Sequence, residues 1–431
     1  MSEKGPAQAV RYGWLMFWLL ACGYILVYFH RLCPAVVAVD MMRDLQAGGA
    51  LLGLLSSAYF YPYAAMQIPA GLLSDSWGPR NTIALFSCVA FVGSVTLGFA
   101  PSLGWAITGR TLVGLGVSMH FVCTLKVLAD WFRPQQFATM TGILIAMGGV
   151  GSITAATPLA LLSSALGWRY SFVLVGLLTF AFAVLVLFIV RDRPQDKGWP
   201  SPVGHAERAV PPISLKEGVK KVVSYPAFWP LAVWFFFNCS IFFSFTGLWG
   251  GPYLMQVYGL SKAQTGSVLM MSAFGMIVGS QLLSYLSTRV VRARKPPLVC
   301  ATLASVGITF ALAFYTDRMS VPGLYVLCLG MGMCTNAIVV IGFTAGKELF
   351  PVQIAGTSTG LLNLFPFLGG ALFQPLLGHL LERGGRIGDA FTVAGYRHAF
   401  LALFCCAVIA FIASLFLKET LDSRDRGGQE I

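Results

Sequence analysis

Hydrophobic residues fill most of the chain in long runs that short polar segments separate. Each run has the roughly 20 or more residues that a helix needs to cross a bilayer core. The pattern predicts twelve membrane-spanning helices, over 12–38, 50–72, 79–100, 105–128, 138–162, 168–190, 226–257, 262–287, 296–316, 321–345, 351–381 and 396–417. The expected fold class is therefore an all-α integral membrane protein.

The longest polar segment lies between the sixth and seventh predicted helices, over 191–225, and is rich in proline and charge. Such a composition is typical of a linker between two compact units. It predicts a six-helix bundle over 1–190, a second bundle over 226–417 and a tail over 418–431.

The two halves also share a sequence repeat. A shift of 218 positions places Gly114 on Gly332 and Gly142 on Gly360, so that DWFRPQQFATMTG overlays ELFPVQIAGTSTG. Further along, GWRYSF and GYRHAF begin the sixth helix of each half. Matching cues at corresponding places predict a duplicated, pseudo-symmetric six-helix unit.

Composition and charge agree with a membrane protein. The chain is 57% hydrophobic and 11% charged, which is too little charge for a soluble domain of 431 residues. Nineteen Lys and Arg residues fall on the face with both termini and the linker, and seven on the opposite face. The positive-inside rule therefore places both termini in the cytoplasm, and the net charge of +12 needs no nucleic acid to explain it.

Motifs of catalysis and cofactor binding are missing from the sequence. The ten cysteines fall inside predicted helices without a CxxC pair, and P-loop, HExxH and GxSxG patterns are absent. The first apolar run is about 28 residues long, too long for the core of a signal peptide. We expect a membrane protein that is not an enzyme and that holds no metal or cofactor.

A short loop after the second predicted helix reads GLLSDSWGPR and contains Gly71, Asp75, Gly78 and Arg80. Its glycines permit a tight turn against neighbouring helices, and its carboxylate can meet helix ends and basic groups. This stretch resembles the GxLxDxxGxR loop of the major facilitator superfamily, which implies a latch for one conformation. The alternative is an ordinary short loop, in which these residue types are common.

The fourth helix begins with GRTLVGLGVS, where Arg110, Gly114 and Gly116 resemble the RxxxGxG element of the same superfamily. Its glycines allow close helix packing. We group Arg110 with the latch. The alternatives are that its side chain lines the cavity, pairs with a neighbouring residue or snorkels toward the membrane surface. With twelve helices and the repeat, the whole chain resembles a major facilitator transporter. The GPxxGG element of drug–proton antiporters is absent, which disfavours drug export.

The first helix carries the candidate for substrate binding. GYILVYFHRL is similar to the first helix of organophosphate–phosphate exchangers, in which a tyrosine-rich stretch precedes an arginine that binds the anionic group. The resemblance implies that role for Arg31. Those exchangers have a second arginine in the seventh helix, where this sequence has Phe243, so a less charged anion such as a carboxylate fits better.

Helical spacing independently places Tyr24, Tyr28 and Arg31 on one stripe of the first helix. A charge inside a span is costly and is usually functional. Snorkelling of Arg31, or pairing with Asp40, is the structural alternative. Since no Asp or Glu lies in the middle of a predicted span, an anionic substrate would supply the missing counter-charge.

The other binding candidates are weaker and are mostly uncharged polar residues inside spans. Each is as easily explained by a hydrogen bond between helices. They are Tyr59, Tyr63 and Gln67 on one face of the second helix, His120 in the fourth, Asn336 in the tenth and Asn363 in the eleventh. His120 is also the best-placed group for proton coupling.

We therefore predict an inner-membrane permease that moves a small organic anion, either a carboxylate or a sugar-acid or phosphate-like compound, by alternating access. Coupling to protons or to a counter-anion is open. The expected partners are the substrate, a candidate co-transported proton and the lipid bilayer, with the chain acting as a monomer. An exporter of a drug or siderophore-like compound and a non-transporting receptor of the same fold are the alternatives.

Overall fold

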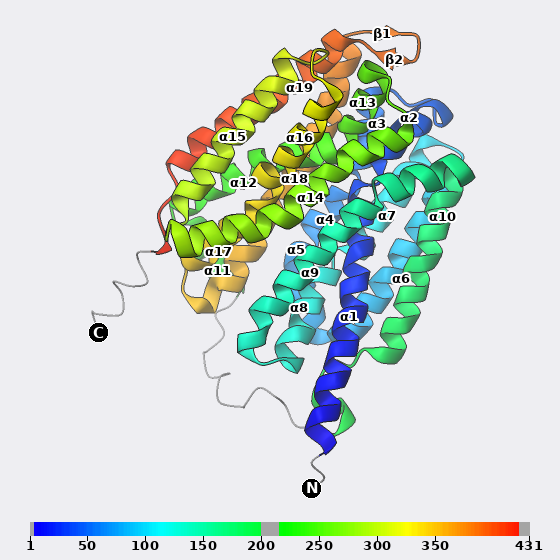
Figure 1. Ribbon diagram of the computed structural model, residues 1–431. Coiled ribbons are helices and arrows are strands. Elements are labelled where there is room, and N and C mark those ends of the chain that lie inside the picture. Colours follow the sequence, from blue (N-terminus) through cyan, green and yellow to red (C-terminus); the bar gives the residue numbers. More distant parts are fainter. Residues whose placement is uncertain (1–3, 200–214, 422–431) are drawn as a thin grey trace.

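The computed structural model describes residues 4–199 and 215–421. The described chain is helical apart from one short antiparallel hairpin, β1 (Arg386–Ile387) with β2 (Ala390–Phe391). Most helices run between two ends of the molecule (Figure 1). We call the end with β1 and β2 the hairpin end, and the end with Lys4 and Leu415 the termini end.

The first half of the chain contains the following helices: α1 (Lys4–Leu32), α2 (Pro34–Asp44), α3 (Gly49–Ser57), α4 (Phe60–Ala65), α5 (Gln67–Ser76), α6 (Pro79–Gly98), α7 (Leu103–Val117), α8 (His120–Trp131), α9 (Pro134–Thr154) and α10 (Thr157–Ile189). The segment predicted as a linker is partly helical, with a 3₁₀ turn η1 (Pro194–Lys197) and α11 (Leu215–Val223). The rest of that segment, 200–214, lies outside the described residues.

The second half contains α12 (Phe228–Ser244), η3 (Phe245–Trp249), α13 (Gly250–Tyr258), α14 (Lys262–Tyr285), η4 (Leu286–Val290), α15 (Lys295–Phe314), α16 (Val321–Met331), η5 (Gly332–Ala337), α17 (Val339–Glu348), α18 (Val352–Arg383) and α19 (Val393–Leu415). The three η segments are π-helical turns that continue their helices without a loop. Such turns often mark functional positions in helices.

These helices coincide with the twelve predicted spans. Within the described residues, ten helical stretches are long and apolar enough to cross a membrane. One of them, 139–189, contains a break at Gly167, whose φ of +76° is outside the helical region, so it is two spans. The second predicted span is divided into α3, α4 and α5, which completes the twelve. The all-α fold class is confirmed.

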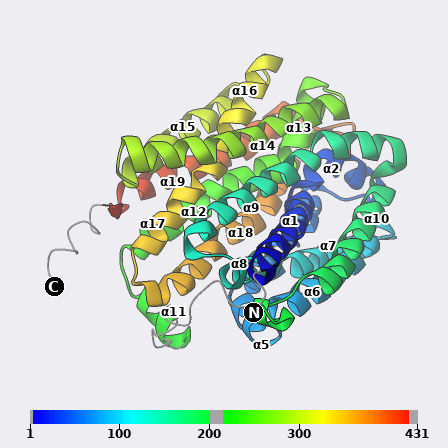
Figure 2. The same cartoon turned by 60° about the horizontal axis from the view of Figure 1, so that its bottom comes forward.

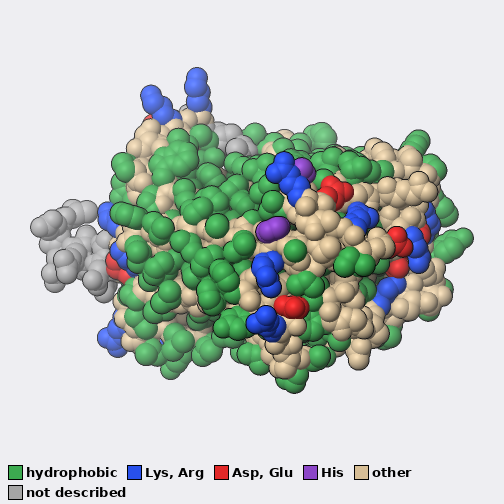
Figure 3. All heavy atoms as spheres, turned by 90° about the horizontal axis from the view of Figure 1, so that it is seen from above, with side chains coloured by type: hydrophobic (Ala, Val, Ile, Leu, Met, Phe, Trp, Pro, Cys, Tyr) green, Lys and Arg blue, Asp and Glu red, His purple; other side chains and the backbone are tan. Residues whose placement is uncertain are grey.

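The outer surface suits a lipid environment. Large apolar side chains are widely exposed on it, among them Phe188 at 73% and Val326 at 69%. The hairpin end, seen from above, carries large hydrophobic areas together with charged side chains in its middle and on both sides (Figure 3). Exposed apolar area on this scale indicates a surface that lipid covers.

Equivalent glycines make equivalent contacts in the two halves. A Cβ on Gly114 would lie 2.1 Å from the carbonyl oxygen of Tyr59, and one on Gly332 would lie 1.9 Å from that of Ser272. The fourth helix of each half thus touches the second helix of its half backbone to backbone. Gly142 and Gly360 correspond as well, since a Cβ on either would have no neighbour within 4 Å.

The halves pack closely at the hairpin end. A Cβ on Gly251 of α13 would lie 1.6 Å from the carbonyl oxygen of Ala35 in α2, and one on Gly53 of α3 would lie 2.5 Å from that of Gln374 in α18. Figure 2 shows α9 running beside α14, where the fifth and eighth spans meet. At Gly251 and Gly53 no side chain separates the backbones of the two halves, so the hairpin end is closed.

Contacts between the halves thin out toward the termini end. Among the hydrogen bonds of the described residues, the one that joins the halves nearest this end runs from Asn363 Nδ2 to Gln67 Oε1, at 2.8 Å. Beyond it, a Cβ on Gly71 or Gly356 would meet nothing within 4 Å. The structure is thus closed at the hairpin end and loosely joined at the termini end.

Candidate binding site

Arg31 lies in the last turn of α1, between the two halves, and is 3% exposed. The helix is interrupted directly after it, because Cys33 and Pro34 begin the separate helix α2. Pro34 has no N–H, so the usual bond to the carbonyl of His30 cannot form. This break fixes where the guanidinium of Arg31 leaves the helix.

Aromatic rings from four helical segments surround the guanidinium. Its central carbon lies 4.4 Å from the ring centroid of Tyr28, 5.0 Å from those of Tyr63 and Phe367, and 5.9 Å from that of Phe243. Tyr28 and Tyr63 belong to the first half, whereas Phe243 and Phe367 belong to the second. We call these four rings the aromatic cage. Both halves of the molecule therefore contact the same cation.

The aromatic cage takes the place of a counter-ion in this structure. Within the described residues, no ion pair includes Arg31, and its buried Nε has no hydrogen-bond partner. An unpaired buried charge costs several kcal/mol, and each ring face offsets roughly 0.5–2 kcal/mol of that. Asp40, the alternative partner from the sequence, is bound to Lys262 instead, at 2.5 Å. The rings therefore offset part of the cost of burying Arg31, and the cation, which has no ion-pair partner among the described residues, can accept an anion.

Most of the residues predicted for binding lie around Arg31. Tyr24 contacts Tyr28 ring to ring at 5.3 Å, and Tyr59 stacks on Tyr63 at 5.6 Å. Gln67 donates to the carbonyl of Tyr63 and accepts from Asn363. The structure thus brings together Arg31, four tyrosines and the Gln67–Asn363 pair.

His120 and Asn336 are placed differently. His120 lies within the first half, where Nε2 is 2.8 Å from the carbonyl oxygen of Leu20 and the ring stacks on Tyr24. Asn336 lies on η5, which packs against α12, α14 and α15. Within 4–199 and 215–421, neither residue has a hydrogen bond or ring contact with Arg31, and no three His, Cys, Asp or Glu side chains are grouped for a metal ion.

Arg110 has a different environment from Arg31, although both are buried. Its Nη1 donates to the carbonyl oxygen of His30 at 2.7 Å, and its Nη2 donates to that of Ser56 at 3.4 Å. Both carbonyls lie where helices break, before Pro34 in the first span and between α3 and α4 in the second. Arg110 thus supplies donors that the broken helices lack. It supports the segment that carries Arg31.

Four of the five residues predicted as a latch lie at the termini end, and the predicted loop is mostly helical: Gly71 and Asp75 are in α5, Gly78 is in the turn and Arg80 is in α6. Arg110, the fifth, bonds to the carbonyls of His30 and Ser56 instead. Asp75 pairs with Lys126 of α8 at 2.5 Å. The guanidinium of Arg80 donates twice to the carbonyl of Leu187, at 2.9 and 2.6 Å. The backbone N–H of Arg80 donates to the carboxylate of Asp192. Partial burial nevertheless raises the pKa of Asp192 above its ordinary value.

The two glycines of this loop differ. Gly78 has a φ of +81°, and a Cβ there would lie 2.2 Å from a carboxylate oxygen of Asp192. Only glycine fits this position without strain. Gly71 has open space around it. The loop is thus tied to the ends of the fourth and sixth spans, and its glycine turn leaves room for the carboxylate.

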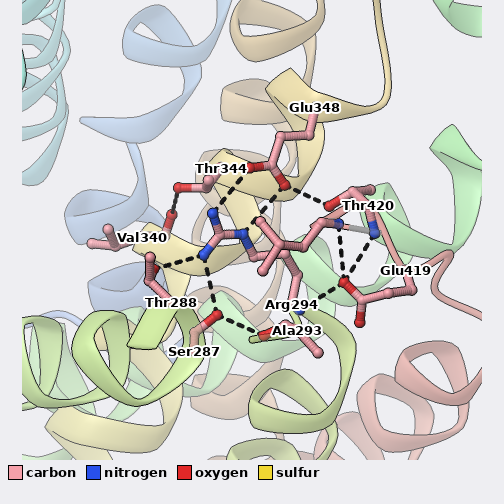
Figure 4. A network of polar contacts seen from close by, with 10 residues as sticks. Ser287, Thr288, Ala293, Arg294, Val340, Thr344, Glu348, Glu419 and Thr420 are labelled. Carbon is pink, nitrogen blue, oxygen red and sulfur yellow. Dashed lines mark hydrogen bonds and ion pairs between the residues drawn. The ribbon is translucent and has the colours of Figure 1, made fainter. Parts of the chain in front are cut away.

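A corresponding polar network holds the termini end of the second half (Figure 4). Arg294 pairs with Glu348 through Nε at 3.2 Å and Nη2 at 3.0 Å. Glu419 accepts the backbone N–H groups of Arg294 and Lys295, and Thr420 donates to Glu348. The chain after α19, predicted as part of a tail, is therefore packed against α15 and α17. Residues 422–431 lie outside the described residues.

Among the described residues, two polar contacts that involve a carboxylate join the halves at the hairpin end. Lys262 of α14 pairs with Asp40 of α2, and both side chains are about one-fifth exposed. Glu382 of α18 accepts the backbone N–H of Gly49, the first residue of α3, at 2.8 Å. Because a helix N-terminus favours a negative charge, this contact stabilises the closed hairpin end.

Sequence reasoning missed part of the site. In the sequence, Phe243 stands out only as the place where the exchangers have an arginine, and Phe367 does not stand out among the 33 phenylalanines. Pro34 was a usable signal, because a proline inside a span frees the carbonyl four residues earlier. Together with the buried Arg110, it could have predicted the bond to His30.

The sequence of this chain is similar to those of known membrane transporters. Residues 20–374 match the model of the Major Facilitator Superfamily. The chain is 24% identical to a probable sulfoacetate transporter of Cupriavidus necator, over 98% of each protein. It is 26% identical to the hexuronate transporter of Bacillus subtilis, over 91% of this chain and 93% of that one.

A solved structure has a similar fold. It is a bacterial homologue of the human lysosomal transporter Spinster, in an inward-facing and unoccupied conformation. The TM-score is 0.74 at 20% identity, and the match covers 96% of this chain and 97% of that one.

Proposed function

Since the chain belongs to the major facilitator superfamily, we propose that it is a secondary active transporter of a small organic anion, which binds at Arg31 and crosses by alternating access. The observation that carries this proposal is a guanidinium buried between the two halves, with rings around it and no carboxylate of the described residues paired to it. A carboxylate or sulfonate would form the forked contact that a guanidinium prefers.

The geometry supports a simple cycle. Arg31, Tyr28 and Tyr63 move with the first half, and Phe243 and Phe367 move with the second. When the halves part at the termini end, the anion enters between them and replaces ring contacts of Arg31. Closure of that end and opening of the hairpin end then release the anion on the other side, as rocking of repeated halves does in this type of transporter.

Names of the relatives support the anionic substrate. Sulfoacetate and hexuronates, the compounds in the two names, are both small organic anions. The distribution of Lys and Arg supports a cytoplasmic position for the termini end in the inner membrane. The Asp75 loop acts as the latch in this proposal, the two halves as its rocking units, and the chain as a monomer. The co-transported ion is a proton or a counter-anion.

Uptake by purified protein in liposomes tests the proposal. The panel contains monocarboxylates, sugar acids, dicarboxylates and phosphate esters, each as a labelled compound. We expect saturable uptake of at least one anion by the wild type, and loss of that uptake in Arg31→Ala with a normal folded yield in size-exclusion chromatography. Arg318→Ala, at an exposed turn, is the matched control. Wild-type uptake by Arg31→Ala, or no uptake of any anion, would contradict the proposal.

A further inference from the structure

We propose that the preferred substrate is a monoanion with a flat apolar body, such as an arene carboxylate or sulfonate, rather than a polyhydroxylated acid or a dianion. This inference rests on the proposed function, because it concerns the same site. It comes from the side chains that surround Arg31, which supply one positive charge, several ring faces and polar groups that are in part bound to one another.

The charge at the site fits one anionic group. Arg31 is 3% exposed, and its buried Nε has no hydrogen-bond partner, so one N–H donor of this cation is unsatisfied. The other buried arginine nearby, Arg110, also has a buried Nε without a partner, but its Nη1 and Nη2 donate to two backbone carbonyls and to Cys33. A dianion would bring a second charge into a site that has one available guanidinium, and burial of an unpaired charge costs several kcal/mol.

The walls of the site fit an aromatic ring. Phe243 and Phe367 stack with their planes 16° apart and their centroids at 5.8 Å, and Tyr63 contacts Phe367 at 4.2 Å. Phe60 adds a further ring 5.2 Å from Phe243. These rings come from both halves, so parting of the halves separates ring faces rather than polar groups. A flat apolar body entering there keeps aromatic contacts on both sides.

Three polar side chains at the site, those of Gln67, Asn363 and Tyr59, are already engaged. Gln67 and Asn363 bond to each other, and Gln67 also donates to the backbone of Tyr63. The hydroxyl of Tyr59 donates to the carbonyl of Val27 at 3.4 Å. A polyhydroxylated acid would need partners for every hydroxyl group that it buries, because each unsatisfied one costs about 1–3 kcal/mol. These engaged groups would have to break existing bonds to provide them.

Competition for binding to purified protein separates the substrate classes. The probes are benzoate, cyclohexanecarboxylate, glucuronate and succinate, and each is measured with the wild type and with Arg31→Ala. We expect benzoate to bind at least about tenfold more tightly than glucuronate and succinate, with all binding lost in Arg31→Ala. Arg31-dependent binding of glucuronate or succinate that equals or exceeds that of benzoate would overturn the inference, while the proposed function would stand.

A pair of variants on one helix tests the ring contacts. Phe243→Leu keeps an apolar side chain but removes the π face, so benzoate affinity should fall about three- to tenfold. Cyclohexanecarboxylate, which has no π face, should lose less. Phe237→Leu, six residues earlier on α12 and in contact with Phe236 and Phe373, is the control and should leave both affinities unchanged. Equal losses for both probes in Phe243→Leu would contradict the ring-stacking argument. Absence of binding by every anion would instead remove the proposed function.

Discussion

Closure of the hairpin end depends on the absence of a side chain at Gly251. A methyl group there would lie 1.6 Å from the carbonyl oxygen of Ala35, whereas ordinary contact begins at 3.4 Å. The backbones of α13 and α2 would have to part by about 1.8 Å, the difference between these two distances. Because the obstacle is backbone on both sides, a rotamer change cannot relieve it.

We therefore expect Gly251→Ala to disfavour the closed hairpin end. Overpacking of this kind costs about 1–3 kcal/mol or more, which shifts a two-state equilibrium about 5- to 150-fold. The contact joins the two halves, so the shift should favour states in which the hairpin end is open. Such a variant should transport more slowly than the wild type, because the closed state is needed in each cycle.

Hydrogen–deuterium exchange followed by mass spectrometry measures this opening directly. Peptides covering 34–57 and 374–383, which meet at the hairpin end, should exchange faster in Gly251→Ala. The control is Gly307→Ala, since a Cβ on Gly307 of α15 meets nothing within 4 Å. Unchanged exchange together with wild-type transport in Gly251→Ala would refute the reasoning.

Three further predictions concern stability. Arg110→Lys replaces two separate N–H donors on a planar fork by one ammonium on a shorter side chain, so we expect at least one bond to the carbonyls of His30 and Ser56 to be lost. Thermal unfolding should then show a loss of about 1–3 kcal/mol, and an unchanged Tm would contradict this. Glu348→Gln leaves Arg294 buried without its charge partner, which should cost about 3–5 kcal/mol in the same assay. Burial works to raise the pKa of Glu419, but backbone N–H groups outweigh it and hold the pKa below its ordinary 4.5. The difference in free energy of unfolding between the wild type and Glu419→Gln should be largest above pH 4.5 and should decline as the pH falls through the lower pKa of the folded state. A difference that does not change with pH would contradict this.

Much of the fold could be predicted because membrane burial leaves a simple signal. A run of about 20 apolar residues has few alternatives to a spanning helix, so all twelve spans coincide with helices. The repeat could also be predicted from the sequence, because backbone contact between helices requires glycine at Gly114 and at the corresponding Gly332. Breaks within helices were harder to predict. Gly167 and the division between α3 and α4 depend on packing partners that no local pattern reveals.

The site was only partly predictable for a different reason. Arg31 stands out in an apolar run, and helical spacing then points to Tyr24 and Tyr28. Phe243 and Phe367 do not stand out, because a phenylalanine in a span faces lipid as readily as it faces a cavity. Their role depends on which side of the helix meets the other half, and that is set by packing between residues more than 200 positions apart.

Charged residues near the ends of spans were misleading for a similar reason. Asp40 was an alternative partner for Arg31 because the two are close in sequence, but it binds Lys262 from the other half. Glu419 lies in a segment predicted as a tail, yet it caps the start of α15. Sequence distance carries little information about such pairs, since the halves meet only in the folded molecule.

The central claim is that the counter-charge of Arg31 is the transported anion. Its most direct test is the thermal stabilisation of purified protein by an anion that the wild type transports, compared between wild type, Arg31→Gln and the control Arg318→Gln. At an anion concentration of about 100 Kd, binding stabilises a protein by about 2.7 kcal/mol. The account predicts this stabilisation in the wild type and in Arg318→Gln, and none in Arg31→Gln. Equal stabilisation of Arg31→Gln by the same anion would contradict it.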